Sequence, residues 1–274
     1  MGKKEDLMSR ETVISKDGTT IAYWRSGKGP PLVLVHGTTA DHSRWIPVMS
    51  AFERRFTVCA IDRRGRGGSG DPDDYAIGRE FEDIAAVVDS LGEPAFLLGH
   101  SYGALCALEA ALLTRNVRKL VLYEPPMDVS GEGINPPGIV DRLEALLEAG
   151  GANKRDEVVA TFMREVAGAP PEVVEHMRSL PAWQARVAAA HTIPRELRVP
   201  EAYRFDPERF RDLEVPTLLL IGGDSPATFE EAEKAVAQAL PSSRILVLPG
   251  QGHVAMDTAT DLFTTEVLRF LEAS

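Results

Sequence analysis

Six short runs of apolar residues recur along the chain, and each is about as long as a β-strand. They lie at residues 31–35, 56–61, 95–98, 119–123, 217–221 and 244–248. Most positions in these runs are apolar, which is typical of strands buried on both faces of a parallel sheet. Between them, apolar residues recur with helical spacing at residues 79–91, 102–114, 229–240 and 262–272. This alternation predicts an α/β fold with a doubly wound, mostly parallel sheet.

The first segment of the chain shows a different pattern. Two β-prone stretches, residues 11–15 and 20–24, flank Lys16-Asp17-Gly18, and Asp-Gly is a strong signal for a hairpin turn. We therefore expect an N-terminal antiparallel hairpin at the start of the sheet. Residues 1–8 precede the hairpin and are expected to be disordered.

The strand pattern is interrupted between residues 124 and 213. This stretch contains only segments with helical spacing, separated by proline-rich joints that include Pro194 and Pro200. A connection between two parallel strands needs far fewer residues. We therefore interpret the stretch as a helical cap inserted between strands 6 and 7. The predicted division is a core of residues 1–128 and 213–274 with a cap of residues 129–212. The helical segments of the cap are expected at residues 138–149, 155–166, 172–178 and 182–191.

Composition narrows the class of function. The 274 residues are 44% hydrophobic and 26% charged, and 30 basic against 41 acidic residues give a net charge of −11. A charge this negative argues against nucleic acid or an anionic membrane as the main partner. The sequence contains no run of 18 apolar residues and no apolar leader. Two cysteines, Cys59 and Cys106, do not make a disulfide framework. These features favour a cytoplasmic protein and leave its oligomeric state open.

The strongest chemical motif is Gly99-His100-Ser101-Tyr102-Gly103, which matches G-x-S-x-G. It follows an apolar strand directly and precedes a helical pattern, and the motif requires this strand–turn–helix context. In such a turn the serine hydroxyl is lifted above the sheet, while side chains at positions 99 and 103 would collide with neighbouring backbone. Ser101 is therefore a candidate nucleophile.

Three further motifs extend this pattern, and together they resemble those of the α/β-hydrolase family. Residues 36–38 (His-Gly-Thr) follow an apolar run, as that family's oxyanion loop does. Residues 62–70 look like its D-x-R-G-x-G-x-S turn with an added residue. Residues 250–253 (Gly-Gln-Gly-His) follow the last strand, where the family keeps its catalytic histidine. The resemblance covers residues 11–128 and 213–272, and the cap corresponds to the family's variable insertion.

The resemblance implies a serine-hydrolase mechanism for this chain. Ser101 would attack the substrate, and His253 would act as its base, because a serine hydroxyl without a base is a poor nucleophile. The backbone N–H groups of Tyr102 and Thr38 would form the oxyanion hole that stabilises the developing negative charge.

The sequence leaves the third catalytic residue open. The family's usual acid lies three residues after the glycine that ends the strand following the cap, and that position is Ser225 here. Asp224 is one residue early. Some family members take the acid from the end of the preceding strand, where Glu124 stands. Asp224 also suits a helix N-cap, and Glu124 suits a solvated strand end. Either acid would orient His253 and stabilise its cationic form, so both are candidates.

A glycine-rich turn offers a competing interpretation. Residues 65–70 satisfy G-x-G-x-x-G after a strand, a pattern that also occurs in dinucleotide-binding folds. Residues 71–74, with three aspartates, follow where a helix would begin, and they would repel phosphate. We therefore expect no cofactor, and we interpret Arg63, Arg64 and Arg66 as turn and surface residues. No metal site is expected either, because H-x-x-H and C-x-x-C spacings are absent from the sequence.

The cap is expected to complete a substrate pocket. The side chains that we expect in the pocket wall are Trp45, Met127, Trp183 and Val254. Such residues make an adaptable apolar cavity and favour a small or medium-sized apolar substrate. The predicted function is hydrolysis of a carboxylic ester through an acyl-enzyme intermediate.

Other reactions stay open for the same set of residues. It also supports C–C bond hydrolysis, lactone opening, and cofactor-free perhydrolysis or haloperoxidation. A non-catalytic ligand-binding protein on this fold is a further alternative. The pair of Ser101 and His253 argues against that alternative, because a receptor need not keep it. The fold alone does not identify the substrate.

Overall fold

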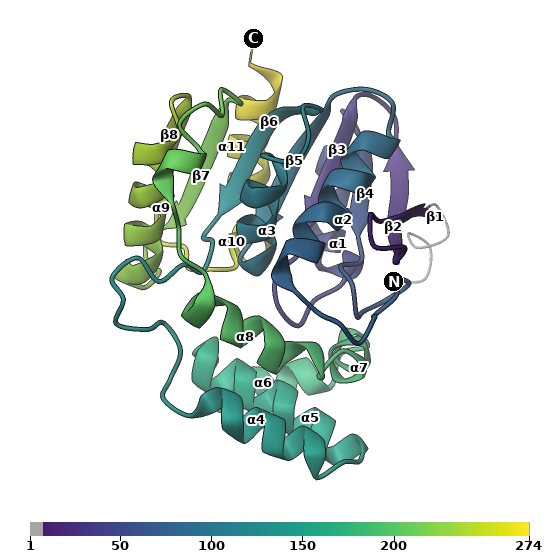
Figure 1. The fold of residues 1–274 in the computed structure, drawn as a ribbon, viewed down its shortest axis with the longest axis vertical. Coiled ribbons are helices and arrows are strands. Elements are labelled where there is room, and N and C mark those ends of the chain that lie inside the picture. The colour runs from purple at the N-terminus through teal and green to yellow at the C-terminus, as the bar shows by residue number, and fades with distance from the viewer. Residues whose placement is uncertain (1–7, 274) are drawn as a thin grey trace.

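The computed structural model contains one eight-stranded sheet flanked by helices (Figure 1). It describes residues 8–273, and the side chains of all of these except residues 200–202. The expected disorder of residues 1–7 lies outside the described residues, whereas Met8 packs against the core. The strands are β1 (Ser9–Ile14), β2 (Thr20–Gly27), β3 (Pro31–Val35), β4 (Thr57–Ile61), β5 (Ala95–His100), β6 (Val117–Tyr123), β7 (Thr217–Gly222) and β8 (Ser243–Leu248).

The sheet has the strand order β1-β2-β4-β3-β5-β6-β7-β8. Strand β2 pairs antiparallel with both β1 and β4, and every other pairing is parallel. Five of the six apolar runs form the middle of the sheet, and every residue of β3, β4, β5 and β7 is buried. The sixth run forms the edge strand β8, where Ile245 and Val247 are exposed, so the expected burial on both faces is wrong for this strand. The predicted fold class, a doubly wound and mostly parallel sheet that begins with an antiparallel hairpin, is therefore confirmed.

Helices cover both faces of the sheet. On one face, α2 (Ile77–Ser90), α3 (Tyr102–Ala110) and α9 (Ala227–Ala239) pack on alternate residues of the strands. On the other face lie α1 (Ile46–Phe52), α10 (Ala255–Thr258) and α11 (Thr260–Glu272), after a short 3-10 helix at His42–Trp45. Helices α1 and α10 were not predicted, because seven and four residues are too short to show helical periodicity.

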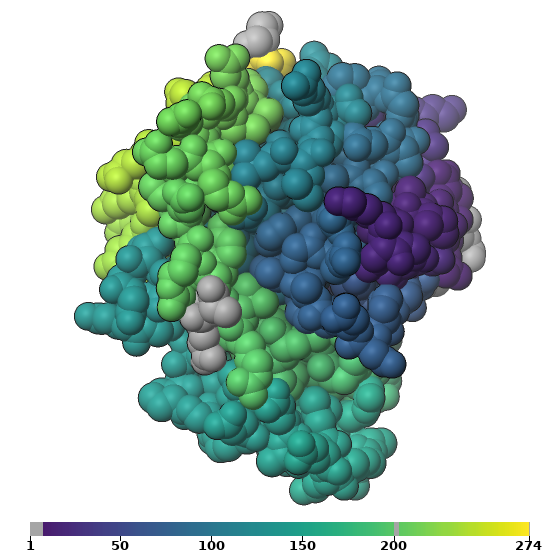
Figure 2. Space-filling view, in the orientation of Figure 1, coloured from purple at the N-terminus to yellow at the C-terminus, as the bar shows by residue number. Residues whose placement is uncertain are grey.

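Five helices between β6 and β7 form a separate layer at one end of the sheet (Figure 1). We call residues 139–202 the helical insertion. It has its own apolar core, and it is in direct contact with the rest of the molecule (Figure 2). Its elements are α4 (Ile139–Glu148), α5 (Ala152–Thr161), a π-helical turn at Phe162–Val166, α6 (Pro171–Arg178), α7 (Ala182–Ala188) and α8 (Thr192–Ala202).

Helix α8 was missed by the sequence analysis. Pro194 and Pro200 were interpreted as joints, but α8 runs from Thr192 to Ala202 through both positions. Pro194 is the third residue of the helix, where a backbone N–H would have no partner within the helix, so its absence costs little. A contact of His191 Nε2 with Asp71 at 2.9 Å and an ion pair of Arg195 with Asp71 at 2.8 Å join this end of the insertion to the core.

Within residues 8–273, no helix combines the length and the apolar character needed to cross a bilayer.

Candidate active site

Ser101 occupies the tight turn between strand β5 and helix α3. Its backbone has φ 55° and ψ −129°, a conformation that L-residues rarely adopt. The turn closes because its neighbours are glycines. A Cβ on Gly99 would lie 2.5 Å from the carbonyl oxygen of Gly103, and a Cβ on Gly103 would lie 2.4 Å from that of His36. Packing on both sides therefore fixes the serine at the carboxyl end of β5.

The loop after β3 lies directly against the serine. A Cβ on Gly37 would come within 2.8 Å of the Cβ of Ser101 and within 3.3 Å of its Oγ, so only glycine permits this approach. Thr38 follows Gly37 in the loop. Tyr102 is the first residue of α3, where backbone N–H groups have no partner within the helix. The backbone of both segments therefore borders the Ser101 side chain.

His253 and Glu124 form a hydrogen-bonded pair at the ends of two other strands. Nδ1 of His253 lies 2.5 Å from Oε2 of Glu124, and Oε1 of Glu124 accepts a 2.7 Å hydrogen bond from the N–H of Gly222. The Glu124 side chain is fully buried, whereas the His253 side chain is 30% exposed. The Glu124 carboxylate thus fixes the imidazole ring through Nδ1, and Nε2 is the ring nitrogen that Glu124 does not contact.

Two further side chains hold His253 in place. The Phe229 ring of α9 stacks on its imidazole, with ring centroids 4.6 Å apart and planes inclined by 15°. Nε2 of His100 lies 2.8 Å from the carbonyl oxygen of His253 and donates to it, since a carbonyl oxygen only accepts. Burial and the charge of His253 hold the pKa of His100 well below its usual range, so His100 is neutral. Phe229 could not be predicted from the sequence as part of the site, because a phenyl ring near a helix start carries no chemical signal.

The structure separates the two acids that the sequence leaves open. Asp224 lies in the loop after β7, where it is exposed, and its backbone N–H donates to the carbonyl oxygen of Gln251 at 2.8 Å. Across the described part of the chain, the Asp224 carboxylate makes no hydrogen bond or ion pair. Glu124 is the acid of the two that contacts His253.

The side chains expected in the pocket wall do not share one wall. Trp45 is 0% exposed in the core beneath α1 and α11, and Met127 is 2% exposed in the core on the opposite face of the sheet. Trp183 is 2% exposed in the core of the helical insertion. Val254, directly after the histidine, is 40% exposed. This placement corrects the expectation for Trp45, Met127 and Trp183, because side chains this large are stabilised by burial in a packed core.

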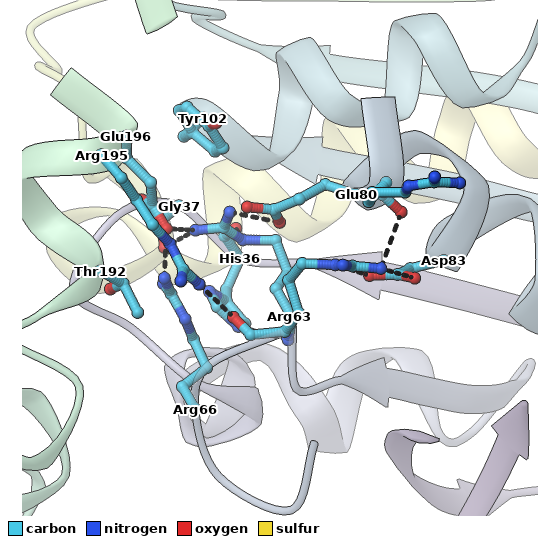
Figure 3. A network of polar contacts seen from close by, with 12 residues as sticks. His36, Gly37, Arg63, Arg66, Glu80, Asp83, Tyr102, Thr192, Arg195 and Glu196 are labelled. Carbon is cyan, nitrogen blue, oxygen red and sulfur yellow. Dashed lines mark hydrogen bonds and ion pairs between the residues drawn. The ribbon is translucent and has the colours of Figure 1, made fainter. Parts of the chain in front are cut away.

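Arg63, Arg64 and Arg66 are buried, which corrects their interpretation as turn and surface residues. None of the three is more than 4% exposed. Arg63 forms ion pairs with Glu80 at 2.7 Å and with Glu196 at 2.9 Å, and Arg66 also pairs with Glu196 (Figure 3). Arg64 has two aspartate partners. Buried charges require partners of opposite charge. The partners of Arg63, Glu80 and Glu196, lie 17 and 133 positions away along the chain, so the sequence of the turn alone does not indicate that Arg63 is buried.

The glycine-rich turn of residues 65–70 encloses a carboxylate of the protein itself. A Cβ on Gly67 would lie 2.2 Å from Oδ2 of Asp62, and the N–H of Gly68 donates to the same oxygen at 2.9 Å. The Ser69 hydroxyl donates to the Asp62 carbonyl oxygen. Gly67 therefore has a structural cause in its close approach to the Asp62 carboxylate.

One group of described side chains has the spacing of a metal site. The ligand atoms of Asp41, His42 and Asp62 lie within 4.8 Å of one another. Oδ1 of Asp62 already accepts from the backbone N–H of His42 at 3.0 Å and pairs with its Nδ1 at 2.7 Å. Oδ2 accepts from Trp24 Nε1 at 3.1 Å as well as from the N–H of Gly68. A carboxylate with four such contacts has little left to offer a cation, so we assign the group to the packing of the turn.

A second buried carboxyl group lies behind Glu124. Glu233 of α9 is fully buried, and its Oε1 accepts a 3.0 Å hydrogen bond from the backbone N–H of Glu124. Burial raises the pKa of Glu233 well above its usual range, and the charge of Glu124 raises it further. Burial thus shifts Glu233 toward its protonated form, and Glu124 is the carboxyl group of the two that contacts His253.

Replacing Glu233 by glutamine is expected to stabilise the protein at pH 8 and to have a much smaller effect at pH 5. An unfolded glutamate loses its proton above about pH 4.5, whereas folded Glu233 keeps it. Between the pKa of unfolded Glu233 and its raised pKa in the folded protein, the wild-type free energy of unfolding therefore falls as the pH rises, by about 1.4 kcal/mol per pH unit. Glutamine keeps the acceptor for the Glu124 N–H but does not titrate. Urea unfolding should show a gain of about 1 kcal/mol or more at pH 8.

The matched control is Glu231→Gln, on the exposed side of the same helix. It should leave the unfolding midpoint nearly unchanged at both pH values. An equal effect of Glu233→Gln at pH 5 and pH 8 would show that Glu233 is ionised in the folded protein.

Comparison with known proteins supports the same fold. A solved structure of an alpha/beta hydrolase from Sphaerobacter thermophilus is 38% identical, with a TM-score of 0.82, and the match covers 95% of this chain and 100% of that one. An esterase from a Rhodococcus species is 26% identical, with a TM-score of 0.75, over 97% of this chain and 99% of that one. The 2-(acetamidomethylene)succinate hydrolase of Mesorhizobium japonicum is 26% identical, over 98% of this chain and 97% of its own length.

The family model described as "Alpha/beta hydrolase family" matches residues 32–265, from β3 into α11. This range includes the loop at residues 36–38, the Ser101 turn, Glu124 and His253. The protein therefore belongs to the alpha/beta hydrolase family.

Proposed function

We propose that the protein is a serine hydrolase that cleaves a carboxylic ester through an acyl-enzyme intermediate. The observation that carries the proposal is the 2.5 Å contact between Glu124 Oε2 and His253 Nδ1, in a site that also holds a serine in a strained turn. His100, the residue before Ser101, hydrogen-bonds to the backbone of His253 and so connects the two parts of the site. An imidazole oriented through Nδ1 offers Nε2 as a base.

The proposed reaction has two steps. In the first, Ser101 Oγ attacks the ester carbonyl while Nε2 of His253 takes the serine proton, and Glu124 stabilises the imidazolium that forms. The N–H groups of Thr38 and Tyr102 donate to the negative oxygen of the tetrahedral intermediate. His253 then gives the proton to the leaving alcohol. In the second step, water attacks the acyl-enzyme carbonyl while His253 takes its proton. The acyl–Oγ bond then breaks, His253 returns the proton to Ser101 Oγ, and the carboxylic acid is released.

The substrate that we propose is a small or medium-sized molecule with an apolar acyl or alcohol part. Val254, next to His253, offers an exposed apolar contact for such a group. The similarity to an esterase supports ester cleavage. The relative from M. japonicum is named for a succinate that carries an acetamido group, so amide hydrolysis by the same residues is the second candidate function. We also propose a cytoplasmic location, which the two buried free cysteines support.

The proposal is tested by covalent labelling and by a matched substrate panel. A fluorophosphonate probe should modify Ser101, as located by peptide mass spectrometry, and p-nitrophenyl esters should be hydrolysed with a burst when deacylation is the slower step. p-Nitroanilides with the same acyl groups separate ester from amide cleavage. Lactones, β-diketones and a peroxide-dependent halogenation assay cover the other reactions. Absence of both a Ser101 adduct and turnover would favour a ligand-binding protein.

A further inference from the structure

Glu196 of helix α8 reaches from the helical insertion into the core. It is 1% exposed, and its Oε1 accepts a 2.9 Å hydrogen bond from Nη2 of Arg63 and another from Nη2 of Arg66 (Figure 3). Burial alone would raise the pKa of Glu196, but the charges of Arg63 and Arg66 outweigh it and lower that pKa. Glu196 is therefore an anion shared by two buried cations.

Arg63 extends this contact to the backbone of the loop. Its Nε donates to the carbonyl oxygen of His36 at 3.0 Å, and its Nη2 donates to that of Gly37 at 3.3 Å. The same Nη2 binds Glu196, so one guanidinium joins the insertion to two consecutive peptide units of the loop. Because Gly37 lies against Ser101, the position of this guanidinium bears directly on the space where the substrate carbonyl reacts.

Arg186 of helix α7 holds the next part of the loop from the same side. Its Nη1 donates to Thr39 Oγ1 at 2.6 Å and to the Thr39 carbonyl oxygen at 3.1 Å. Thr39 has φ 65°, and the left-handed region is strained for a β-branched residue. Such a conformation persists only where surrounding contacts impose it, and Arg186 supplies two of them.

We propose that Glu196 and Arg186 are positioning residues for the oxyanion hole, and that the loop of residues 36–39 holds its reactive geometry only while the helical insertion is docked on the core. The inference rests on the proposed serine-hydrolase function. An insertion that lifts away withdraws Glu196 from Arg63 and Arg186 from Thr39 in one movement. The Thr38 N–H then loses its alignment, so turnover is confined to the closed form of the enzyme, as in enzymes whose closure completes the catalytic geometry.

The test uses two variants in the full-length protein and one matched control. Glu196→Gln keeps the shape and an acceptor oxygen but removes the charge, and Arg186→Gln removes the contact to Thr39. Each should lower kcat by about 10-fold to 100-fold with KM within about twofold, because the loss falls on the transition state. Affinity for a trifluoromethyl ketone, which forms a tetrahedral adduct on Ser101, should fall by a similar factor. Glu165→Gln breaks an exposed ion pair with Arg142 inside the insertion and should change none of these values.

Amide hydrogen exchange gives a readout that does not depend on turnover. Exchange of the peptide that spans residues 36–41 should be about fivefold faster or more in both variants, and unchanged in Glu165→Gln. If Glu196→Gln fails to fold, the inference is tested with Arg186→Gln alone. The Arg186 side chain is partly exposed, so its replacement is expected to disturb folding less. Folded variants with wild-type kcat, inhibitor affinity and exchange would overturn the inference. A wild-type protein without ester turnover or a Ser101 adduct would instead refute the proposed function, and the exchange rates alone would then show whether the insertion holds the loop.

Discussion

Replacement of Ser101 by alanine is expected to lower kcat for p-nitrophenyl butyrate by about 10⁴-fold to 10⁶-fold. Without Oγ no acyl-enzyme forms, and the remaining rate comes from the oxyanion donors and from substrate binding. The fold should survive, because alanine adopts φ 55° with no more strain than serine and is smaller than the side chain that Gly37 packs against. Steady-state kinetics on protein with an unchanged circular dichroism spectrum measures the effect.

The control for this variant is Ser179→Ala, at an exposed serine of the helical insertion. It should keep the wild-type rate and the fluorophosphonate label. A Ser101→Ala protein that still hydrolyses the ester at the wild-type rate would remove Ser101 from the mechanism, and a label on another residue would then identify the true nucleophile.

Replacement of Glu124 by glutamine is expected to lower kcat by about 10³-fold to 10⁴-fold with little change in fold. Glutamine fits the same space and still accepts the hydrogen bond from the Gly222 N–H through Oε1. Its amide nitrogen would then face Nδ1 of His253 and donate to it. The imidazole would be forced into the tautomer with its proton on Nε2, which cannot accept the proton of Ser101.

Asp224→Asn is the matched control, because it makes the same chemical change in the acid that the sequence analysis could not exclude. Its carboxylate is exposed and lies in a loop outside the pair of Glu124 and His253, so kcat should stay within about twofold of wild type. The assignment of Glu124 would fail if Asp224→Asn lost activity and Glu124→Gln kept it.

The sheet was predictable from the sequence because most of its strands are continuous apolar runs, and such runs indicate burial on both faces. Strands β3, β4, β5 and β7 are buried at every residue, and runs of valine, leucine and isoleucine have no other simple explanation. The Ser101 turn was predictable for a related reason. Its glycines are required by backbone contacts of 2.4 and 2.5 Å, and a constraint that strict is visible in five consecutive residues.

Features that depend on distant parts of the chain were not predictable. Glu124 and Asp224 could not be separated by counting, because one residue of loop length decides which acid reaches His253. The burial of Arg63 depends on Glu196, which lies on α8. This helix was not predicted, because its two prolines were interpreted as joints between helices. Trp183 was expected in the pocket wall, but the insertion is large enough to form an apolar core of its own, and Trp183 is buried in that core.

The position of Glu124 at the end of β6 has a consequence for the synthesis of the enzyme. The nucleophile, the oxyanion loop and the acid of the proposed mechanism all lie within residues 36–124, and the base follows only after β8, the last strand along the chain. A nascent or prematurely terminated chain that ends before residue 253 carries a serine with no proton acceptor. If the proposed mechanism holds, incomplete products of translation would not form the acyl-enzyme, and hydrolysis would require the chain through β8 and His253.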